Sequence, residues 1–256
     1  MKEFNTTGLC NPNKHYMVDI SDKLENIKKL VEKEKYFIIN RPRQYGKTTT
    51  LVALENNLKD EYLVISISFE GTDINSFSTP QNFCNLFVEL VSENLDYVDE
   101  KLSALFVSFS KDINSLTNLS RAISRFIKEI DKEVILIIDE VDKSSDNQIF
   151  LDFLGMLRNK YLQREAGYGV TFKSVILAGV YDIKNLKLKL RPNEERKYNS
   201  PWNIAVPFNI DMSLSEKGIE GMLEEYKNDR KIELDTKKAS EFIYFYTSGY
   251  PFLVSR

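Results

Sequence analysis

One feature constrains the fold of this chain most. An apolar run is followed by a short loop and then by a potential helix. Residues 36–40 read YFIIN and predict a buried strand, whereas residues 49–54 can continue a helix. Gly46, Lys47 and Thr48 stand at the turn between them. Successive backbone N–H groups at a helix N-terminus point to one place and can hold phosphate oxygens. The order of strand, loop and helix therefore predicts a phosphate-binding loop, or P-loop.

Each residue type in this loop has a chemical reason to be there. Gly46 allows close approach of the backbone, Lys47 would reach the β- and γ-phosphates, and the Thr48 hydroxyl would bind Mg²⁺. We assign Lys47 a catalytic role as well. The alternative interpretation is a basic surface turn after a strand. The residues expected around the phosphates are Arg43, Gln44, Tyr45, Gly46, Lys47, Thr48 and Thr49.

The loop departs from the common pattern G-x-x-x-x-G-K-[ST] at its first position. Arg41 stands where the first glycine is expected. Arginine does not adopt positive φ as freely as glycine. We therefore expect the loop to turn differently, with Pro42 fixing one dihedral angle.

A second motif follows about ninety residues later, where residues 134–142 read VILIIDEVD. The apolar residues predict a strand buried on both faces of a parallel sheet. Asp139 at its carboxyl end would bind the metal, and Glu140 would polarise the attacking water. The alternative is a core strand that ends in an acidic turn. Both motifs in this order favour nucleotide binding, and Glu140 favours hydrolysis.

Three segments together resemble the bacterial AAA-like ATPase families, which are relatives of the STAND and archaeal-type ATPases in the P-loop superfamily. These segments are FNTTGLCNPNKHYMVDISDKLENIKKL, RPRQYGKTTTL and IIDEVDK. The RPRxxGK variant without the first glycine is typical of that group, and the likeness covers nearly the whole chain. The resemblance implies an α/β P-loop NTPase fold of the AAA/ASCE kind. It has a three-layer core around a mainly parallel sheet, and a small C-terminal helical lid.

The resemblance also implies an activity. ATP would be hydrolysed to ADP and phosphate with Mg²⁺, and this would drive or gate a conformational change in attached domains or partners. Tyr16 would lie over the adenine, and Pro251 in Gly249-Tyr250-Pro251 would contact the base or its surroundings. The alternatives are that Tyr16 packs on the core and that Pro251 only begins a helix.

Two further expectations concern the γ-phosphate. In AAA enzymes a small polar sensor stands at the tip of the fourth strand, but this chain offers Gly179, Tyr181 and Asp182 there. The sensor is therefore missing or displaced, which argues against efficient hydrolysis. Arg191 or Arg196 could act as an arginine finger. We favour the alternative that residues 184–202, which contain both arginines, form a solvated basic loop.

Composition excludes several classes of protein. The chain has 256 residues, 42% of them hydrophobic and 29% charged, with a net charge of −3. This charge argues against a chain-wide electrostatic grip on nucleic acid. No apolar run approaches the roughly 20 residues of a membrane span, and no signal core is visible. Cys10 and Cys84 give no disulfide framework, and the single His15 argues against a zinc site. We expect a cytoplasmic protein without a membrane partner.

Apolar runs alternate with amphipathic segments, which predicts βαβ units. The expected strands are 36–40, 63–69, 134–139, 174–180 and 203–209. The expected helices are 21–33, 47–58, 80–95, 115–130, 147–163, 213–228 and 236–248. Segment 104–111 is read as core or an edge strand. We expect an ATPase core with an adenine-side segment over 1–211 and a partial helical lid over 212–256.

The chain stops at GYPFLVSR, an apolar segment that reads as a helix cut short. We expect a longer protein, whose further domain would reach a protein or nucleic-acid client; a natural C-terminus is the alternative. Homo-oligomerisation stays open. Two other functions compete with the ATPase: a nucleotide-binding switch or scaffold with little turnover, and a small-molecule kinase. The helical lid and the Asp-Glu pair disfavour the kinase.

Overall fold

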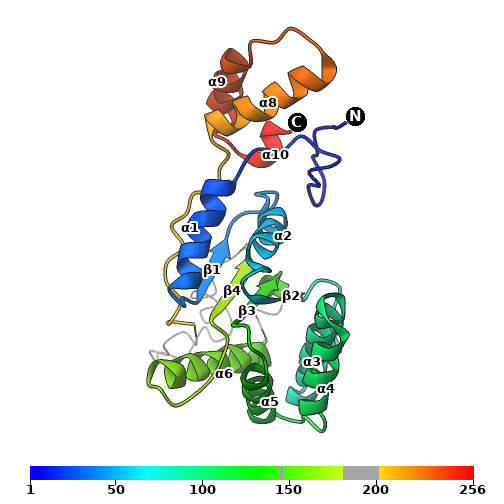
Figure 1. Cartoon of the computed structure of the whole chain (residues 1–256), viewed down its shortest axis with the longest axis vertical. Helices are drawn as coiled ribbons and strands as arrows, with labels where there is room; N and C mark the ends of the chain where they lie inside the picture. The colour runs from blue at the N-terminus through cyan, green and yellow to red at the C-terminus, as the bar shows by residue number, and fades with distance from the viewer. Residues whose placement is uncertain (144–146, 181–201) are drawn as a thin grey trace, which may run out of the picture. The chain divides into compact units, whose positions relative to one another are not determined.

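The computed structural model describes residues 1–143, 147–180 and 202–256, and it has an α/β fold built on one parallel sheet. The four strands stand in the order β1-β4-β3-β2, and every neighbouring pair is parallel (Figure 1). This confirms the predicted fold class. The strands are β1 (Phe37–Asn40), β2 (Leu63–Ser68), β3 (Val134–Asp139) and β4 (Ser174–Gly179).

The two central strands explain why the sequence shows unbroken apolar runs rather than alternation. All six residues of β3 and all six of β4 are buried. Ile137 pairs with Ile176 across the two strands, and Ile138 pairs with Ile67 of β2. A parallel sheet that is covered on both faces needs apolar side chains at every position. Four of the predicted strands agree with the structure to within one residue at each end.

The fifth predicted strand, 203–209, is wrong. Only one residue of it, Val206, forms a parallel bridge with Phe37, and the Val206 N–H donates to the Tyr36 carbonyl at 2.9 Å. Pro207 follows directly and supplies no N–H for a longer ladder. Ala205 and Phe208 are buried nevertheless, and the Phe208 ring stacks on Phe37 with centroids 5.8 Å apart.

Helices fill the segments between the strands. The seven predicted helices all form, with ends within three residues of expectation, and capping side chains define several of their starts. For example, the Thr79 hydroxyl accepts a hydrogen bond from Asn82 N, and the Ser115 hydroxyl accepts one from Asn118 N. The helices are α1 (Ser21–Glu32), α2 (Lys47–Leu58), α3 (Pro80–Val98), α4 (Glu100–Phe109), α5 (Leu116–Glu129), α6 (Gln148–Glu165), α8 (Glu216–Arg230), α9 (Thr236–Thr247) and α10 (Pro251–Val254).

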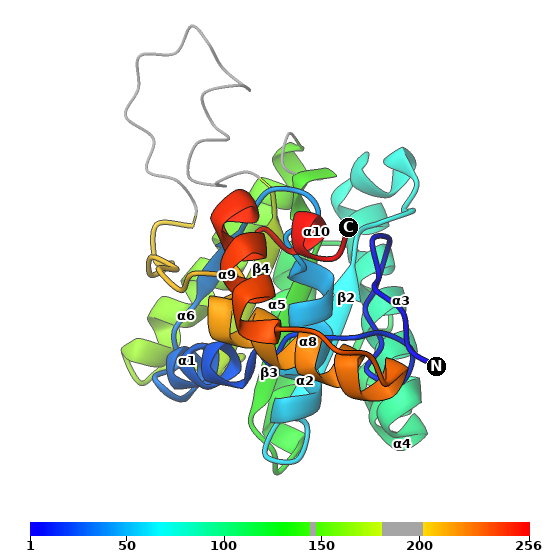
Figure 2. The ribbon, with the colours of Figure 1, turned by 90° about the horizontal axis from the view of Figure 1, so that it is seen from above.

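Segment 104–111, read from the sequence as core or an edge strand, belongs to helix α4. The Asp99 carboxylate accepts a hydrogen bond from Lys101 N and begins the helix. Ser103 and Phe106 are buried at helical spacing, so the period of the apolar residues is that of a helix. In Figure 1 and Figure 2, α4 lies beside α3, against which it packs.

The described chain divides into two compact units. The first comprises Met1–Lys29, Arg41–Asn57 and Asn209–Arg256, and the second comprises Leu30–Asn40 and Leu58–Phe208. The first unit therefore contains the P-loop and α8 to α10, whereas the second contains the sheet. The predicted functional division into a core over 1–211 and a lid over 212–256 stays a prediction.

The second unit has a large aromatic core. Phe83, Phe87, Phe150 and Phe153 are all fully buried, and the Phe83 and Phe153 rings lie 5.0 Å apart. The first unit has a smaller apolar cluster, formed by Tyr16, Val18, Ile219, Met222, Leu223 and Val254. Within the described residues, none of the helices has the length and apolar character needed to cross a bilayer.

Candidate nucleotide-binding site

The P-loop occupies residues 41–46 of the first unit, between the end of β1 and the start of α2 at Lys47. Two of its residues have left-handed backbone conformations: Gln44 with φ of 62° and Gly46 with φ of 73°. Arg41, at the position of the missing first glycine, is not left-handed. The turn is therefore made at Gln44 and Gly46, which explains how the loop closes without the first glycine. Left-handed glutamine is uncommon and marks a conformation that the surroundings enforce.

The side chain of Lys47 is nearly buried, with 8% exposure. Its Nζ donates hydrogen bonds to the carbonyls of Arg41 at 3.0 Å and Pro42 at 3.3 Å. The ammonium is therefore held by the carbonyls of its own loop. A phosphate bound to the loop would offer it a charged acceptor, and charge-assisted hydrogen bonds are stronger than those to carbonyls.

The start of α2 is fixed by threonine hydroxyls. The Thr50 hydroxyl donates to the Gly46 carbonyl at 2.9 Å, and the Thr49 hydroxyl accepts from Cys10 N at 3.2 Å. Thr49 therefore ties the N-terminal segment to the helix that follows the loop. Thr48, the predicted magnesium ligand, is at the second residue of this helix.

A pocket in the first unit adjoins the P-loop. Five residues expected from the sequence to bind nucleotide line it together: Tyr16, Tyr45, Gly46, Thr49 and Pro251. They come from three distant parts of the chain. Met17 and Val18, next to Tyr16 in the expected adenine-side segment, line it too, and the remaining lining residues were not predicted: Cys10, Ile20, Lys23, Thr50, Met212, Leu214, Met222 and Ser255.

The pocket walls are largely apolar, as a site for a flat heterocycle requires. Three of the five methionines of the chain, Met17, Met212 and Met222, line it. Methionine is adaptable and packs well on aromatic rings. The apolar stretch around Tyr16 was the only sequence signal for this wall. Met212 and Leu214 could have been found as apolar residues directly before the first predicted lid helix.

Tyr16 packs on its neighbours, as one interpretation expected, and its contact with an adenine stays a prediction. Its ring lines the pocket, but it also packs on Phe4 and Tyr226 with centroids 5.0 and 5.4 Å away. Its hydroxyl donates to the Asp229 carboxylate. Lys23 is a polar member of the wall, where its Nζ donates to the Ser213 carbonyl. Burial lowers the pKa of Lys23, and nearby Asp211 partly offsets this effect.

Gly249 is required by close backbone packing. Its φ is +71°, and a Cβ there would lie 2.0 Å from the Leu214 carbonyl oxygen. The Leu214 N–H donates to the Gly249 carbonyl at 2.7 Å. Pro251 is the first residue of α10, so the prediction that it begins a helix is confirmed together with its place in the pocket wall.

The second motif lies in the second unit, at the carboxyl end of β3. Asp139 is 8% exposed, and its Oδ1 accepts a hydrogen bond from Glu140 N at 2.8 Å. Glu140 has a left-handed backbone with φ of 53°. Such a conformation costs about 1–3 kcal/mol in a non-glycine residue and is often found at functional sites. The backbone at Glu140 is therefore unusual, and the role expected of its carboxylate stays a prediction.

Asp142 was quoted within the motif but received no role from the sequence. Its carboxylate accepts a hydrogen bond from Val180 N, at the end of β4. A Cβ on Gly179 would lie 2.9 Å from both carboxylate oxygens. A carboxylate therefore occupies the strand tip where a small polar sensor was expected, and Gly179 makes the room for it. Tyr181, Asp182, Arg191 and Arg196 lie outside the described residues.

Mg²⁺ prefers a few hard oxygen ligands and completes its octahedron with water and phosphate oxygens. The Thr48 hydroxyl and the Asp139 carboxylate are donors of this kind. Within the described ranges, no group of three or more His, Cys, Asp or Glu side chains could hold a metal. The chemistry of these two side chains is that of Mg²⁺ ligands, and the expectation that they bind one ion stays a prediction.

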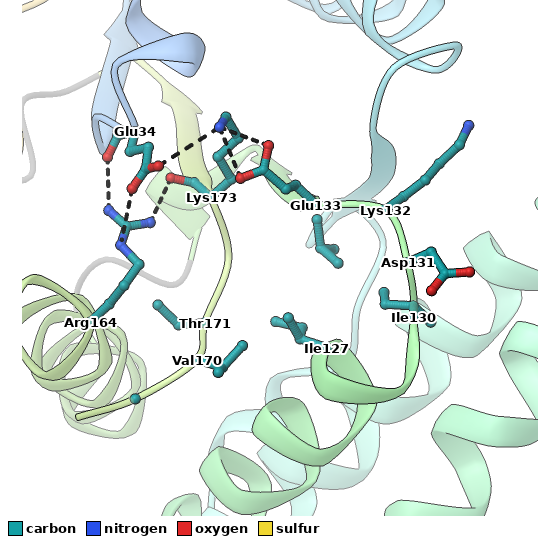
Figure 3. Close-up of a pocket in the computed structure, with 12 residues that line it drawn as sticks. Glu34, Ile127, Ile130, Asp131, Lys132, Glu133, Arg164, Val170, Thr171 and Lys173 are labelled. Atoms are coloured by element: carbon teal, nitrogen blue, oxygen red, sulfur yellow. Dashed lines mark hydrogen bonds and ion pairs between the residues drawn. The ribbon is translucent and has the colours of Figure 1, made fainter. Parts of the chain in front are cut away.

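A second hollow, shown in Figure 3, belongs to the second unit and is explained by its ion pairs. Arg164 donates to the carbonyls of Phe172 and Lys173 at 2.7 and 2.8 Å and to that of Glu34 at 3.0 Å. Lys173 is paired with Glu133 at 2.8 Å. The two cations contact the residues just before β1 and β4, so their role here is structural.

The fold agrees with that of two solved structures of the ORC2 protein from Aeropyrum pernix. The ADP form has a TM-score of 0.54 at 11% identity, with 98% of this chain and 63% of that one covered. The form with ADPNP and ADP has a TM-score of 0.55 at 13% identity, with 98% and 62% covered. Cdc6p from Pyrobaculum aerophilum gives 0.48 at 15% identity, with 88% and 52% covered. The chain thus spans between about half and two thirds of these proteins.

No curated protein matches the chain. The family model described as "AAA-like domain" matches residues 10–256, which include both motifs and all three helices α8 to α10. This confirms the resemblance seen in the sequence. The chain belongs to the AAA-like domain family.

Proposed function

We propose that the protein binds ATP with Mg²⁺ and hydrolyses it to ADP and phosphate. One observation carries this proposal: the P-loop residues Tyr45, Gly46 and Thr49 share a single apolar pocket with Tyr16 and Pro251. A phosphate-binding loop beside an apolar pocket matches the two halves of a nucleotide. The family and the fold of the solved relatives support the same proposal.

In this proposal the base enters the pocket between Tyr16 and Pro251, and the phosphates bind the N–H groups of residues 43–49. Lys47 exchanges the carbonyls of Arg41 and Pro42 for β- and γ-phosphate oxygens. Thr48 and Asp139 would hold Mg²⁺, as the two motifs of the sequence and the family resemblance imply, and the ion would neutralise phosphate charge. Arg43, Gln44 and Tyr45 shape the loop around the phosphates.

Glu140 is proposed to orient the attacking water. The water oxygen forms a bond to the γ-phosphorus, and the bond from that phosphorus to the bridging oxygen of ADP breaks. The carboxylate of Glu140 accepts a hydrogen bond from the water, whose proton leaves with the phosphate. Its left-handed backbone gives its side chain a direction that an ordinary strand end would not. The Asp142 carboxylate, bonded to Val180 N, holds the turn that follows.

The runner-up is a nucleotide-binding switch or scaffold with little turnover. The tip of β4 favours it, because Gly179 and the Asp142 carboxylate stand where a small polar sensor was expected, whereas the Asp139-Glu140 pair disfavours it. In either case we propose that residues 212–256 act as a lid and pass the nucleotide state to attached domains or to a protein or nucleic-acid client. A cytoplasmic location and homo-oligomerisation remain parts of this proposal.

The binding step is tested by Lys47→Ala. We expect it to abolish tight binding of a fluorescent ATP analogue, because the phosphates lose their main cation. Lys237→Ala is the matched control, since Lys237 is an exposed lysine on α9. Equal affinities of the Lys47→Ala variant and the parent protein would reject the P-loop assignment.

The hydrolytic step is tested by Glu140→Gln. We expect ATP binding to persist and phosphate release to fall at least tenfold, a barrier increase of about 1.4 kcal/mol or more. Glu241→Gln, at an exposed position of α9, serves as the control. If the parent protein binds ATP but releases no phosphate, the switch is the better description.

A further inference from the structure

We propose that Tyr250 is a positioning residue for the phosphate-binding loop and that it links the start of α10 to that loop. This inference rests on the proposed nucleotide binding. It assigns a role to the middle residue of Gly249-Tyr250-Pro251, whose two neighbours alone were considered from the sequence. All residues involved belong to the first unit.

The Tyr250 side chain contacts the loop in two ways. Its hydroxyl donates a hydrogen bond to the Arg43 carbonyl at 2.9 Å. Its ring packs on that of Tyr45, with centroids 5.0 Å apart and an angle of 42° between the planes. Such ring pairs stabilise beyond simple burial. One side chain thus touches the loop on both sides of Gln44.

The place of Tyr250 is itself fixed. Gly249 packs on the Leu214 backbone so closely that any Cβ would clash, and the Leu214 N–H binds the Gly249 carbonyl. The neighbouring Ser213 hydroxyl lies 3.4 Å from the Tyr45 hydroxyl. Three segments are therefore in mutual contact. They are the segment before α8, the turn before α10 and the P-loop.

The consequence for phosphate binding follows from peptide geometry. The Arg43 carbonyl and the Gln44 N–H belong to the same peptide, and no described peptide is cis. In a planar trans peptide these two groups point in opposite directions. When Tyr250 holds the Arg43 carbonyl, it also sets the direction of the Gln44 N–H, one of the donors that the loop offers to phosphate. It further supports the left-handed conformation of Gln44.

Tyr250→Phe removes this hydrogen bond and keeps the ring contact with Tyr45. We expect affinity for ADP to fall about 3- to 10-fold, the usual effect of one hydrogen bond, and affinity for AMP to stay the same. AMP lacks the phosphate that the loop grips most, so the ratio of the two affinities reports on the loop. Both are measured by displacement of a fluorescent ATP analogue.

Tyr246→Phe is the matched control, because Tyr246 is 67% exposed on α9 and its loss of a hydroxyl should change neither affinity. Hydrogen exchange of peptides from residues 41–50 with Mg-ADP gives a second readout. We expect weaker protection in Tyr250→Phe. An unchanged ADP to AMP ratio with unchanged protection overturns the inference, as does an equal loss for both nucleotides.

The experiments distinguish a failure of the Tyr250 role from a failure of the proposed nucleotide binding. If Lys47→Ala abolishes binding and Tyr250→Phe behaves as the parent protein, the site stands and the positioning role is rejected. If the parent protein binds no nucleotide at all, the proposed function fails, and the inference fails with it. The unfolding midpoint of Tyr250→Phe should match that of Tyr246→Phe, which separates positioning from a general loss of stability.

Discussion

The two units differ in how they use apolar side chains. The second unit closes its core completely: helix α3, helix α6 and the sheet meet in a cluster of phenylalanine rings that are fully buried. The first unit has a smaller apolar cluster that includes Tyr16, Ile219 and Met222, and part of its apolar surface lines a pocket beside the P-loop. One unit therefore contains a large packed core, whereas the other has an apolar pocket beside the loop that we propose binds nucleotide. Binding sites require this second arrangement, since a filled core has no room for substrate.

The largest expected loss of stability comes from truncating a buried side chain in the core of the second unit. Phe153 is fully buried and its ring lies 5.0 and 5.1 Å from those of Phe83 and Phe87. Phe153→Ala should lower the free energy of unfolding by about 3–5 kcal/mol, because the cavity cannot collapse. Denaturant unfolding with and without Mg-ATP measures it.

Variants in the two units should differ in how strongly Mg-ATP stabilises them. The stabilisation that Mg-ATP confers depends on its affinity for the native state, so Phe153→Ala should leave that increment unchanged. Met222→Ala, which enlarges the pocket of the first unit, should reduce the increment instead. If both variants lose the same ligand stabilisation, the division of roles between the two units is wrong.

A smaller effect distinguishes two glycines of the first unit. Gly249→Ala should cost roughly 3 kcal/mol, because the new methyl group meets the Leu214 carbonyl and the backbone is left-handed. At Gly46 nothing lies within 4 Å of a Cβ, so Gly46→Ala should cost only the left-handed backbone, about 1–2 kcal/mol. Thermal unfolding of the two variants without nucleotide gives the comparison. Equal losses would show that the contact with Leu214 is not tight.

The smallest effect is a pH dependence of stability that comes from a buried lysine in the core of the second unit. Lys160 is 3% exposed, and its Nζ donates to the Ser120 carbonyl and the Ser124 hydroxyl. Burial lowers the pKa of Lys160 to about 8, below the value of about 10.4 expected in the unfolded chain. Between these values the unfolded state binds more protons, so stability rises with pH in that window.

Lys160→Met should remove this dependence. Relative to the variant, the parent protein should gain about 2 kcal/mol of unfolding free energy between about pH 8 and pH 10. Below pH 8 the lysine is charged in both states and its burial cost is fully present. Urea unfolding across this range provides the measurement, and parallel pH profiles would show that Lys160 is solvated in the native state.

The sequence predicted the parallel sheet well, because buried strands such as 134–139 leave an unbroken apolar run. The strand predicted at 203–209 is wrong, and at 104–111 the edge-strand alternative is wrong while the core alternative is supported by the buried Phe106. In the first case Pro207 interrupts a run that is buried without being a strand. In the second, a short apolar stretch is compatible with strand or helix, and the Asp99 cap decided for helix α4.

The sequence also determined the chemistry proposed for the P-loop and for the Asp139-Glu140 pair, since the residue types and the short spacing on which the proposal rests lie within a few consecutive residues. Tertiary structure alone decided which distant residues join them. The contact of Tyr250 with Arg43 spans 207 residues of chain, and the place of Asp142 depends on how closely β4 approaches the turn after β3. Such contacts follow from packing and leave no periodic trace, so no local pattern could have indicated them.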